Sequence, residues 1–423
     1  MELAKDDRTL HDRAPGGAPP ARAARLGPWL LMAGLVITAF NLRPAISGLS
    51  PLLEEVRDDL GMNGVVAGLL TSVPPLCFAL FGTTAPRLAR RLGPAVVAAA
   101  GLGAIAAGLV LRSLAGGTVF FLAASALALA GIAVNNVLMP VLVKRYFPDR
   151  VGTATGFYST AFALGTSSAA ALTVPLTHAA GESWRVSLAL WAVVALPGIP
   201  AWLLAERHRR AAAPASAAAS AGTAPAAATG RPRLLRSRTA WALACFFGLQ
   251  STAAYVTMGW VPQMFRDAGV SAGTAGVLLA IIMGIGAPLG FVIPRLATRY
   301  RRQGPLIAVL GVSGLLAYAG LWLAPAGGAW LWAVLLGIAN CAFPVALTMI
   351  GLRSRTSAGV ARLSAFVQSF GYLISVPGPL LVGTLNDVTG GWEVPLALLA
   401  VLMAAQIAVG FAAGRDRCVD DGH

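Results

Sequence analysis

The sequence predicts an all-α membrane protein of twelve transmembrane helices, arranged as two pseudo-symmetric halves of six. Composition, the recurrence of long apolar segments and an internal repeat each favour this fold. Of the 423 residues, 57% are hydrophobic and only 12% are charged, which is about half of the charged fraction of soluble globular proteins. The composition therefore indicates a chain that lies mainly in the bilayer.

Twelve apolar segments are long enough to cross a bilayer. They lie at about 28–52, 64–86, 94–113, 118–143, 151–175, 184–205, 239–263, 271–294, 305–324, 329–350, 362–384 and 392–413. Residues 1–27 before them are polar and rich in Arg, Pro and Gly. The apolar run that follows is too long for the h-region of a signal peptide, so we expect a disordered cytoplasmic tail.

The chain has a net charge of +15, and its basic residues are distributed unequally between the two predicted sides of the membrane. With the N-terminus inside, all but five of the 32 Lys and Arg residues lie in the tails, the central segment and the inner loops. The exceptions are Arg43, inside the first apolar segment, and Arg57, Arg112, Arg185 and Arg266, which we place on the outer side. This asymmetry predicts cytoplasmic termini in an inner (plasma) membrane protein. Because aromatic residues do not interleave with the basic loops, we expect no nucleic-acid partner.

Nothing in the sequence indicates a metal, a cofactor or catalysis. The four cysteines form no CxxC motif, and the four histidines lie in predicted loops or tails, so no zinc-like spacing occurs. A phosphate loop and a dinucleotide fingerprint are also missing. We therefore expect no cofactor and no enzymatic activity.

The chain repeats itself at an offset of 208 residues. For example, residues 85–89 resemble residues 293–297. Two parallel repeats of this kind place a binding site near the membrane midplane, between the halves. The predicted organisation is an N-terminal half at 28–205, a flexible basic cytoplasmic linker at 206–238, a C-terminal half at 239–413 and a cytoplasmic tail at 414–423.

Arg43 gives the strongest indication of function. It lies inside the first apolar segment, in the run Asn41-Leu42-Arg43-Pro44, and a charge there is costly unless it faces a polar cavity or a binding site. We predict that it faces the central cavity and binds an anionic or strongly polar solute. The alternative is structural: Arg43 snorkels outward or pairs with an acid near the outer end, such as Glu54.

Polar residues on other helices are candidates to complete this site. They gather in the first, fourth, fifth, seventh, tenth and eleventh helices, whereas the third, sixth, ninth and twelfth are nearly apolar and are expected to face lipid. The candidate solute-binding residues are Arg43, Asn41, Ser47, Asn135, Asn136, Tyr255, Asn340, Gln368 and Tyr372. For the asparagines, hydrogen bonding between neighbouring helices is the open alternative.

A family resemblance rests on the first helix. Residues 41–53 read Asn-Leu-Arg-Pro-Ala-Ile-Ser-Gly-Leu-Ser-Pro-Leu-Leu, which resembles the first-helix signature of the cyanate/2-nitroimidazole permease family within the major facilitator superfamily. Residues 67–78, 85–93 and 143–150 fit the same family. The resemblance implies a monomer that carries a small solute, similar to cyanate or 2-nitroimidazole, across the membrane by alternating access.

The resemblance also indicates a cytoplasmic gate, with one departure. The superfamily usually has an Asp after the Gly in the loop between the second and third helices, but Pro86 stands near that position here. The candidate gating residues that remain are Arg87, Arg90, Arg91 and Arg295.

Two other functions stay open. A broad-specificity drug or metabolite exporter of the same fold would favour a large aromatic cavity and an embedded acid, and the apolar segments contain no acid. A membrane sensor would need an appended signalling domain, which the linker and the short tails do not supply.

Overall fold

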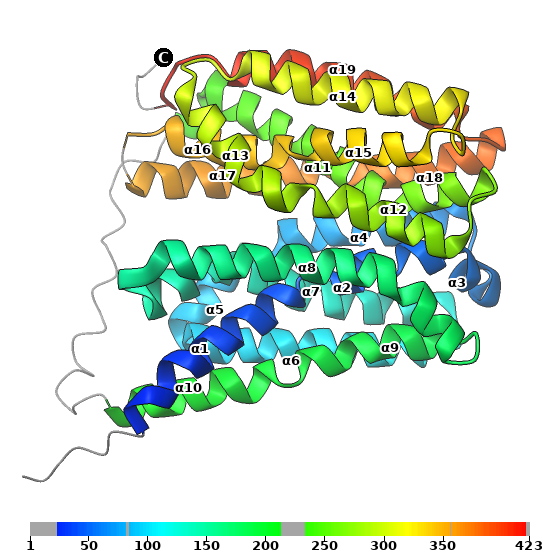
Figure 1. The fold of residues 1–423 in the computed structure, drawn as a ribbon. Helices are drawn as coiled ribbons and strands as arrows, with labels where there is room; N and C mark the ends of the chain where they lie inside the picture. Colours follow the sequence, from blue (N-terminus) through cyan, green and yellow to red (C-terminus); the bar gives the residue numbers. More distant parts are fainter. Residues whose placement is uncertain (1–22, 82–83, 213–232, 356, 420–423) are drawn as a thin grey trace, which may run out of the picture.

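The computed structural model describes residues 23–81, 84–212, 233–355 and 357–419. In these residues the chain forms α-helices, short 3-10 helices and their connections, gathered in one bundle (Figure 1). The all-α prediction is therefore confirmed. Most of the predicted tail and the middle of the predicted linker lie outside the described residues.

The first half contains six transmembrane segments. The first consists of α1 (Ala23–Phe40), α2 (Pro44–Ser47) and the 3-10 helix η1 (Ser50–Leu52), which continues into α3 (Leu53–Leu60). The second is α4 (Gly64–Phe81) with α5 (Ala85–Leu92), and the third is α6 (Pro94–Ser113). The fourth is α7 (Thr118–Tyr146), the fifth is α8 (Val151–Ala179), and the sixth is α9 (Trp184–Ala195) with α10 (Gly198–Ala212).

The second half repeats this order. A 3-10 helix, η4 (Arg233–Arg236), leads into α11 (Arg238–Asp267), the seventh segment. The eighth is α12 (Ala272–Gly284) with α13 (Gly286–Arg299), and the ninth is α14 (Gly304–Leu323). The tenth is α15 (Ala329–Asn340) with α16 (Ala342–Leu352), the eleventh is α17 (Ser357–Ser375) with α18 (Pro377–Thr389), and the twelfth is α19 (Glu393–Ala413).

Prolines explain where several segments are interrupted. A proline inside a helix lacks the backbone N–H, and its ring clashes with the carbonyl four residues earlier. Three helices, α1, α12 and α15, end four residues before a proline, at Phe40, Gly284 and Asn340, where Pro44, Pro288 and Pro344 follow. The first of these breaks contains Arg43.

Ten of the described segments are long and apolar enough to cross a bilayer, by length and composition. The fifth and seventh segments, α8 and α11, do not meet this criterion although they have 29 and 30 residues. At 1.5 Å per residue each is about 43 Å long, which is long enough to cross a bilayer. They fail the criterion because they are too polar. Both pack against the other half of the molecule, where polar side chains face protein.

The two halves lie one above the other in Figure 1, with α6, α9 and α10 along the lower edge and α14 and α19 along the upper edge. Between the edges α8 packs on α12, and α4 packs on α18, so that these four helices join the halves. Glycines permit the close approach: a Cβ on Gly276 would lie 2.4 Å from the Ala170 carbonyl oxygen, and one on Gly68 would lie 2.9 Å from the Leu380 Cα.

The edge helices expose apolar side chains. Val309 on α14 and Val401 on α19 are each 66% exposed, and Val193 on α9 is 59% exposed. This agrees with the expectation that the sixth, ninth and twelfth segments face lipid, since such side chains would be poorly placed in water.

The two ends of the bundle are named here after the segments found there. The linker face holds the start of α1, the end of α10, η4 and the end of α19. The far face holds α3 and the connections 180–184, 267–272 and 389–393.

The residues at the predicted start of the linker continue the helix of the sixth segment. Helix α10 continues to Ala212, and Glu206 within it is only 4% exposed. Tyr146 Oη donates a hydrogen bond to Glu206 Oε2 at 3.2 Å. This bond helps to compensate the burial of a carboxylate near the linker face.

Candidate functional site

The site begins at the break in the first transmembrane segment. The residue before a proline is disfavoured in helical geometry, and Arg43 accordingly adopts φ −131° and ψ −24° directly before α2. Its carbonyl accepts hydrogen bonds from the backbone N–H groups of Ile46 at 2.9 Å and Ser47 at 3.0 Å. A short hydrogen-bonded turn therefore fixes Arg43 at the point where Pro44 interrupts the helix.

The Arg43 guanidinium lies among aromatic rings from both halves. Its Cζ is 5.1 Å from the ring centre of Phe162 on α8, 5.9 Å from that of Tyr255 on α11 and 6.0 Å from that of Phe78 on α4. Attraction between a cation and a ring face contributes roughly 0.5–2 kcal/mol. The rings thus reduce the cost of keeping this cation inside the bundle.

The Arg43 guanidinium retains free hydrogen-bonding capacity. Its Nη1 is buried and has no hydrogen-bond partner within the described part of the chain. Glu54, the acid considered as its partner, pairs with Arg266 at 2.7 Å instead. Leaving a buried donor unpaired costs about 1–3 kcal/mol, and a bound anion or polar solute would remove that cost.

An aromatic wall lies beside this guanidinium. The rings of Tyr372 and Phe78 stack with their centres 5.0 Å apart and an interplanar angle of 23°. Tyr372 also meets Phe247 edge to face at 5.1 Å and lies 6.5 Å from Tyr255. Three of the predicted residues, Arg43, Tyr255 and Tyr372, are therefore brought together from the two halves.

Two predicted residues of the first segment bond to the backbone of neighbouring helices. Asn41 is 1% exposed, and its Nδ2 donates to the carbonyl oxygens of Ile37 at 2.8 Å and Val194 at 3.2 Å. Ser47 is fully buried, and its Oγ donates to the Thr166 carbonyl oxygen at 3.0 Å. These bonds tie the broken segment to α9 and α8.

Asn135 and Asn136 differ in their surroundings. Asn135 is fully buried and lies against α6, because a Cβ on Gly101 would come within 2.5 Å of its Nδ2. Neither Nδ2 nor Oδ1 of Asn135 has a partner among the residues that the structure describes. The neighbouring Asn136 is half-buried.

The two predicted amides of the second half differ in their partners. The backbone carbonyl oxygen of Asn340, at the end of α15, accepts a hydrogen bond from Gln250 Nε2 at 3.4 Å, whereas the Asn340 Nδ2 has no partner among the described residues. Gln368 Nε2 donates to Ser364 Oγ at 2.7 Å within α17. Two polar side chains of the eleventh segment, Gln368 and Ser364, thus pair with each other.

The four candidate gating arginines are exposed at the linker face. Arg87, Arg90 and Arg91 lie on α5 and Arg295 lies on α13. Arg90 and Arg91 occupy the last turn of α5, where a cation offsets the partial negative charge of a helix C-terminus.

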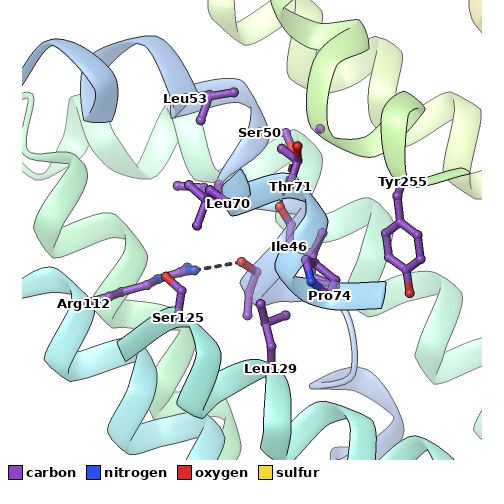
Figure 2. A pocket seen from close by; sticks show the side chains of 13 residues that line it. Ile46, Ser50, Leu53, Leu70, Thr71, Pro74, Arg112, Ser125, Leu129 and Tyr255 are labelled. Carbon is purple, nitrogen blue, oxygen red and sulfur yellow. Dashed lines mark hydrogen bonds between the residues drawn. The ribbon is translucent and has the colours of Figure 1, made fainter. Parts of the chain in front are cut away.

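Arg112, which the sequence places on the outer side of the membrane, is buried inside the bundle and is only 1% exposed. Its Nη1 donates a hydrogen bond to the Ala45 carbonyl oxygen at 2.8 Å, drawn as the dashed line in Figure 2. Arg112 thereby braces α2 just after the break that holds Arg43. Its position in the last turn of α6, still inside the apolar segment 94–113, is the signal that marks it as a second buried cation.

A cavity of about 30 Å³ lies beside Arg112. Figure 2 shows Arg112 and Ser125 side by side at one end of this cavity and Tyr255 at the other. Pro74 lies between these ends, and Tyr255 is also one of the rings around Arg43. The cavity has room for one or two molecules the size of water.

Ion pairs join the two halves at the far face. Arg266, near the end of α11, lies 2.7 Å from Glu54 Oε2 and 2.8 Å from Glu55 Oε2, and it donates to the Pro51 carbonyl oxygen at 2.9 Å. Arg266 Nη1 donates a hydrogen bond to Glu55 Oε2, and the carboxylates of Glu54 and Glu55 supply the countercharge of the guanidinium. Arg266 therefore stays charged.

Two further ion pairs lie on the same face. Arg57 is 3.8 Å from Asp387 of α18, which again joins the halves, and Asp387 also accepts a hydrogen bond from Val65 N at 3.2 Å. Arg185 and Asp59, 2.5 Å apart, both belong to the first half. The sequence analysis located these charges on one side of the membrane but gave no basis for pairing them.

Known proteins with similar sequences are membrane transporters. Residues 31–339 match the sequence profile of the Major Facilitator Superfamily. The chain is 34% identical over 396 residues to the uncharacterized transporter YycB of Bacillus subtilis (strain 168), covering 92% of this chain and 94% of that protein. It is 33% identical over 389 residues to the 2-nitroimidazole transporter of Escherichia coli (strain K12), covering 92% and 96%. It is 28% identical over 375 residues to the cyanate transport protein CynX of the same organism, covering 87% and 92%.

Solved structures with this fold include two transporters. The nucleoside transporter NupG superposes with a TM-score of 0.69 at 13% identity, over 91% of this chain and 98% of that one. The D-xylose–proton symporter superposes with a TM-score of 0.68 at 13% identity, over 92% and 98%. At these identities the likeness concerns the fold alone.

Proposed function

We propose that this chain, which belongs to the Major Facilitator Superfamily and within it to the group of the 2-nitroimidazole transporter and CynX, carries a small anionic or strongly polar solute by alternating access. Membership of this group makes the protein a multi-pass membrane transporter. The solute class and the role of Arg43 are the new parts of the proposal.

One observation carries the proposal: the half-buried Arg43 lies between the halves, and its buried Nη1 has no hydrogen-bond partner and no ion-pair partner in the described residues. A guanidinium offers a planar fork of N–H donors, which matches a carboxylate, a nitro group or a linear anion. A solute bound there would both neutralise Arg43 and supply the missing hydrogen bonds. Its position between helices of both halves is where a carrier of this fold binds its solute.

The aromatic wall narrows the range of possible solutes further. Phe78 and Tyr372 come from opposite halves and stack on each other, so a planar solute can lie against either ring when the halves separate. Ring stacking of this kind is worth about 0.5–1.5 kcal/mol beyond the burial of area. A small planar anion or a nitro-substituted ring satisfies both the guanidinium and the wall. These are the solute types named for the two Escherichia coli relatives.

The orientation is part of the proposal. We place the linker face in the cytoplasm and the protein in the inner membrane as a monomer, because the basic residues concentrate at that face. The far face, with its ion pairs between the halves, is then the closed outer side of the carrier. The proposal assigns this structure to the state in which the solute site is reached from the cytoplasm.

The test is uptake into proteoliposomes that contain the purified protein. Radiolabelled cyanate and 2-nitroimidazole are offered separately to the wild type, Arg43→Ala and Arg43→Lys. Removing a buried charge from a hydrogen-bonded solute costs about 2–5 kcal/mol, so Arg43→Ala is expected to lose at least about 30-fold in uptake. Arg43→Lys keeps the charge without the fork and should fall between the two. Arg185→Gln, which alters an exposed arginine of the far face, is the control and should transport normally.

A broad-specificity exporter is the second candidate, and the aromatic cluster around Tyr372 favours it. Its signature would be transport of many unrelated compounds with equal rates in the wild type and Arg43→Ala. That result would remove Arg43 from the site and replace the proposal.

A further inference from the structure

The first transmembrane segment is contacted by a second buried guanidinium, on the other side of α2. Arg112 lies at the end of α6, and its side chain is 1% exposed. Only Nη1 is used, in the bond to the Ala45 carbonyl oxygen. Its Nε and Nη2 are buried and have no partner in the described ranges.

The cavity beside Arg112 contains further hydrogen-bonding groups. Ser125 on α7 is 2% exposed, and its Oγ has no partner among the described residues. Ser50 lines the same cavity and donates to the Ile46 carbonyl oxygen at 3.2 Å, which leaves its own oxygen able to accept. Figure 2 shows the Ser125 side chain beside the Arg112 guanidinium, at the same end of the cavity.

Among the residues that the structure describes, no acidic side chain lines this cavity. The carboxylates nearest in the sequence to its lining residues are committed elsewhere: Glu54 and Glu55 to Arg266, and Asp59 to Arg185. A buried cation without a countercharge is strongly destabilising, because the desolvation cost is not repaid. Arginine does not escape this cost by losing its proton under physiological conditions.

We propose that Arg112, Ser125 and the cavity between them form a second anion site, which takes one small monovalent inorganic anion of the size of a halide. The anion would accept hydrogen bonds from Arg112 Nε or Nη2 and from Ser125 Oγ. The small volume, about 30 Å³, excludes a ring such as nitroimidazole. Arg43 does not line this cavity, although Tyr255 borders both places. The proposed site is therefore separate from the solute site at Arg43 and does not depend on what the protein transports.

Binding at this site would also act on the first segment. The bond from Arg112 to the Ala45 carbonyl holds α2, which begins one residue after Arg43. An anion that fixes the Arg112 side chain therefore stabilises the break in which Arg43 lies. Arg112 is in this respect a positioning residue.

The test measures thermal unfolding of the purified full-length protein in detergent against anion concentration. The buffer anion is gluconate, which is too large for the cavity, and chloride or bromide is added at constant ionic strength. Binding to the folded state predicts a saturable rise in the unfolding midpoint of about 2–5 °C. A crystal grown in bromide should show an anomalous peak beside Arg112.

Three variants locate the effect. Arg112→Gln should abolish the rise, and Ser125→Ala should weaken the apparent affinity roughly tenfold, the worth of one hydrogen bond to a charged group. Arg43→Gln should leave the rise unchanged. If Arg112→Gln does not fold, Ser125→Ala decides, since Ser125 has no hydrogen bond to lose in the described structure.

Two outcomes would overturn the proposal. A rise that persists in Arg112→Gln or is unaffected by Ser125→Ala, but disappears in Arg43→Gln, would place the anion at Arg43. The absence of any anion-dependent rise, together with no bromide peak, would mean that the cavity holds only water. Neither result bears on transport of cyanate or 2-nitroimidazole, so the two proposals can fail separately.

Discussion

Replacing Arg266 with Gln is expected to open the far face of the transporter. Arg266 on α11 makes three bonds across the interface between the halves, to Glu54, Glu55 and the Pro51 carbonyl oxygen. Glutamine keeps much of the length of the side chain but removes the charge. The change therefore weakens the closed arrangement of the far face without touching the aromatic site.

The magnitude follows from exposure and geometry. The Arg266 side chain is 15% exposed, but Glu54 and Glu55 are 45% and 38% exposed, so each ion pair is worth only about 0.5–1 kcal/mol. The bond to the Pro51 carbonyl adds about 1 kcal/mol. Losing most of these contacts, about 2 kcal/mol, shifts the ratio of open to closed far face roughly 30-fold. Added salt should reduce the difference, because exposed pairs are screened.

Thiol labelling measures this ratio. Thr71 is half-buried on α4 and lies against Gly259 of α11, where a Cβ on the glycine would come within 2.6 Å of Thr71 Cγ2. Its accessibility should therefore increase when the halves separate. A Thr71→Cys variant is made in a background without the native cysteines, Cys77, Cys245, Cys341 and Cys418. A membrane-impermeant maleimide is then applied from the far face. Its rate of reaction should rise about 10- to 30-fold in Arg266→Gln.

Arg185→Gln is the matched control. Arg185 also forms a far-face ion pair, with Asp59, but both residues belong to the first half. Its loss should lower stability without changing the labelling rate. Equal rates in Arg266→Gln and the parent, or an equal rise in Arg185→Gln, would refute the assignment of Arg266 to the closure of the far face.

Three further predictions test the interface and the site. Gly276→Val should accelerate far-face labelling, because the added Cβ would lie 2.4 Å from the Ala170 carbonyl oxygen and force α12 from α8. Tyr372→Leu should weaken 2-nitroimidazole binding about fivefold more than cyanate binding, whereas Tyr372→Phe should not, as measured by competition for uptake. Pro44→Ala should let α1 continue through the break, which would change the orientation of the Arg43 side chain. Uptake should then fall by at least about tenfold at normal expression. Normal uptake would contradict the role of the break.

The positions of the transmembrane segments can be predicted from the sequence because they depend on the local composition of the chain. A bilayer requires about twenty apolar residues for each crossing, and the twelve predicted segments correspond to the helices of the structure. The interruptions of helices at prolines can be predicted only in part. Pro44 and Pro344 each interrupt a helix, but Pro140 and Pro262 lie inside continuous helices. Whether a proline breaks a segment thus depends on neighbours that can accommodate the bent backbone.

The sequence likewise predicts the candidate site only in part. Arg43 stands out in the sequence because a charge inside an apolar segment is rare. Its ring contact Tyr255 is among the predicted residues, and so is Tyr372, which lies against Tyr255 and Phe78. Asn41 and Ser47 are equally conspicuous, but the structure engages them with backbone carbonyls of α9 and α8. Polarity in a membrane segment indicates that a partner is needed, without telling whether the partner is solute or protein.

The sequence by itself determined the class of protein and the two six-helix halves, and it singled out Arg43 as a candidate, because each of these rests on hydrophobicity or charge along one segment. Only the tertiary structure revealed that Arg112 is buried, that Arg266 pairs with Glu54 and Glu55, and that Phe78 and Tyr372 meet between the halves. Each of these contacts joins residues from different helices. Packing between helices sets the distances in these contacts. The order of residues within a single helix carries no direct information about that packing.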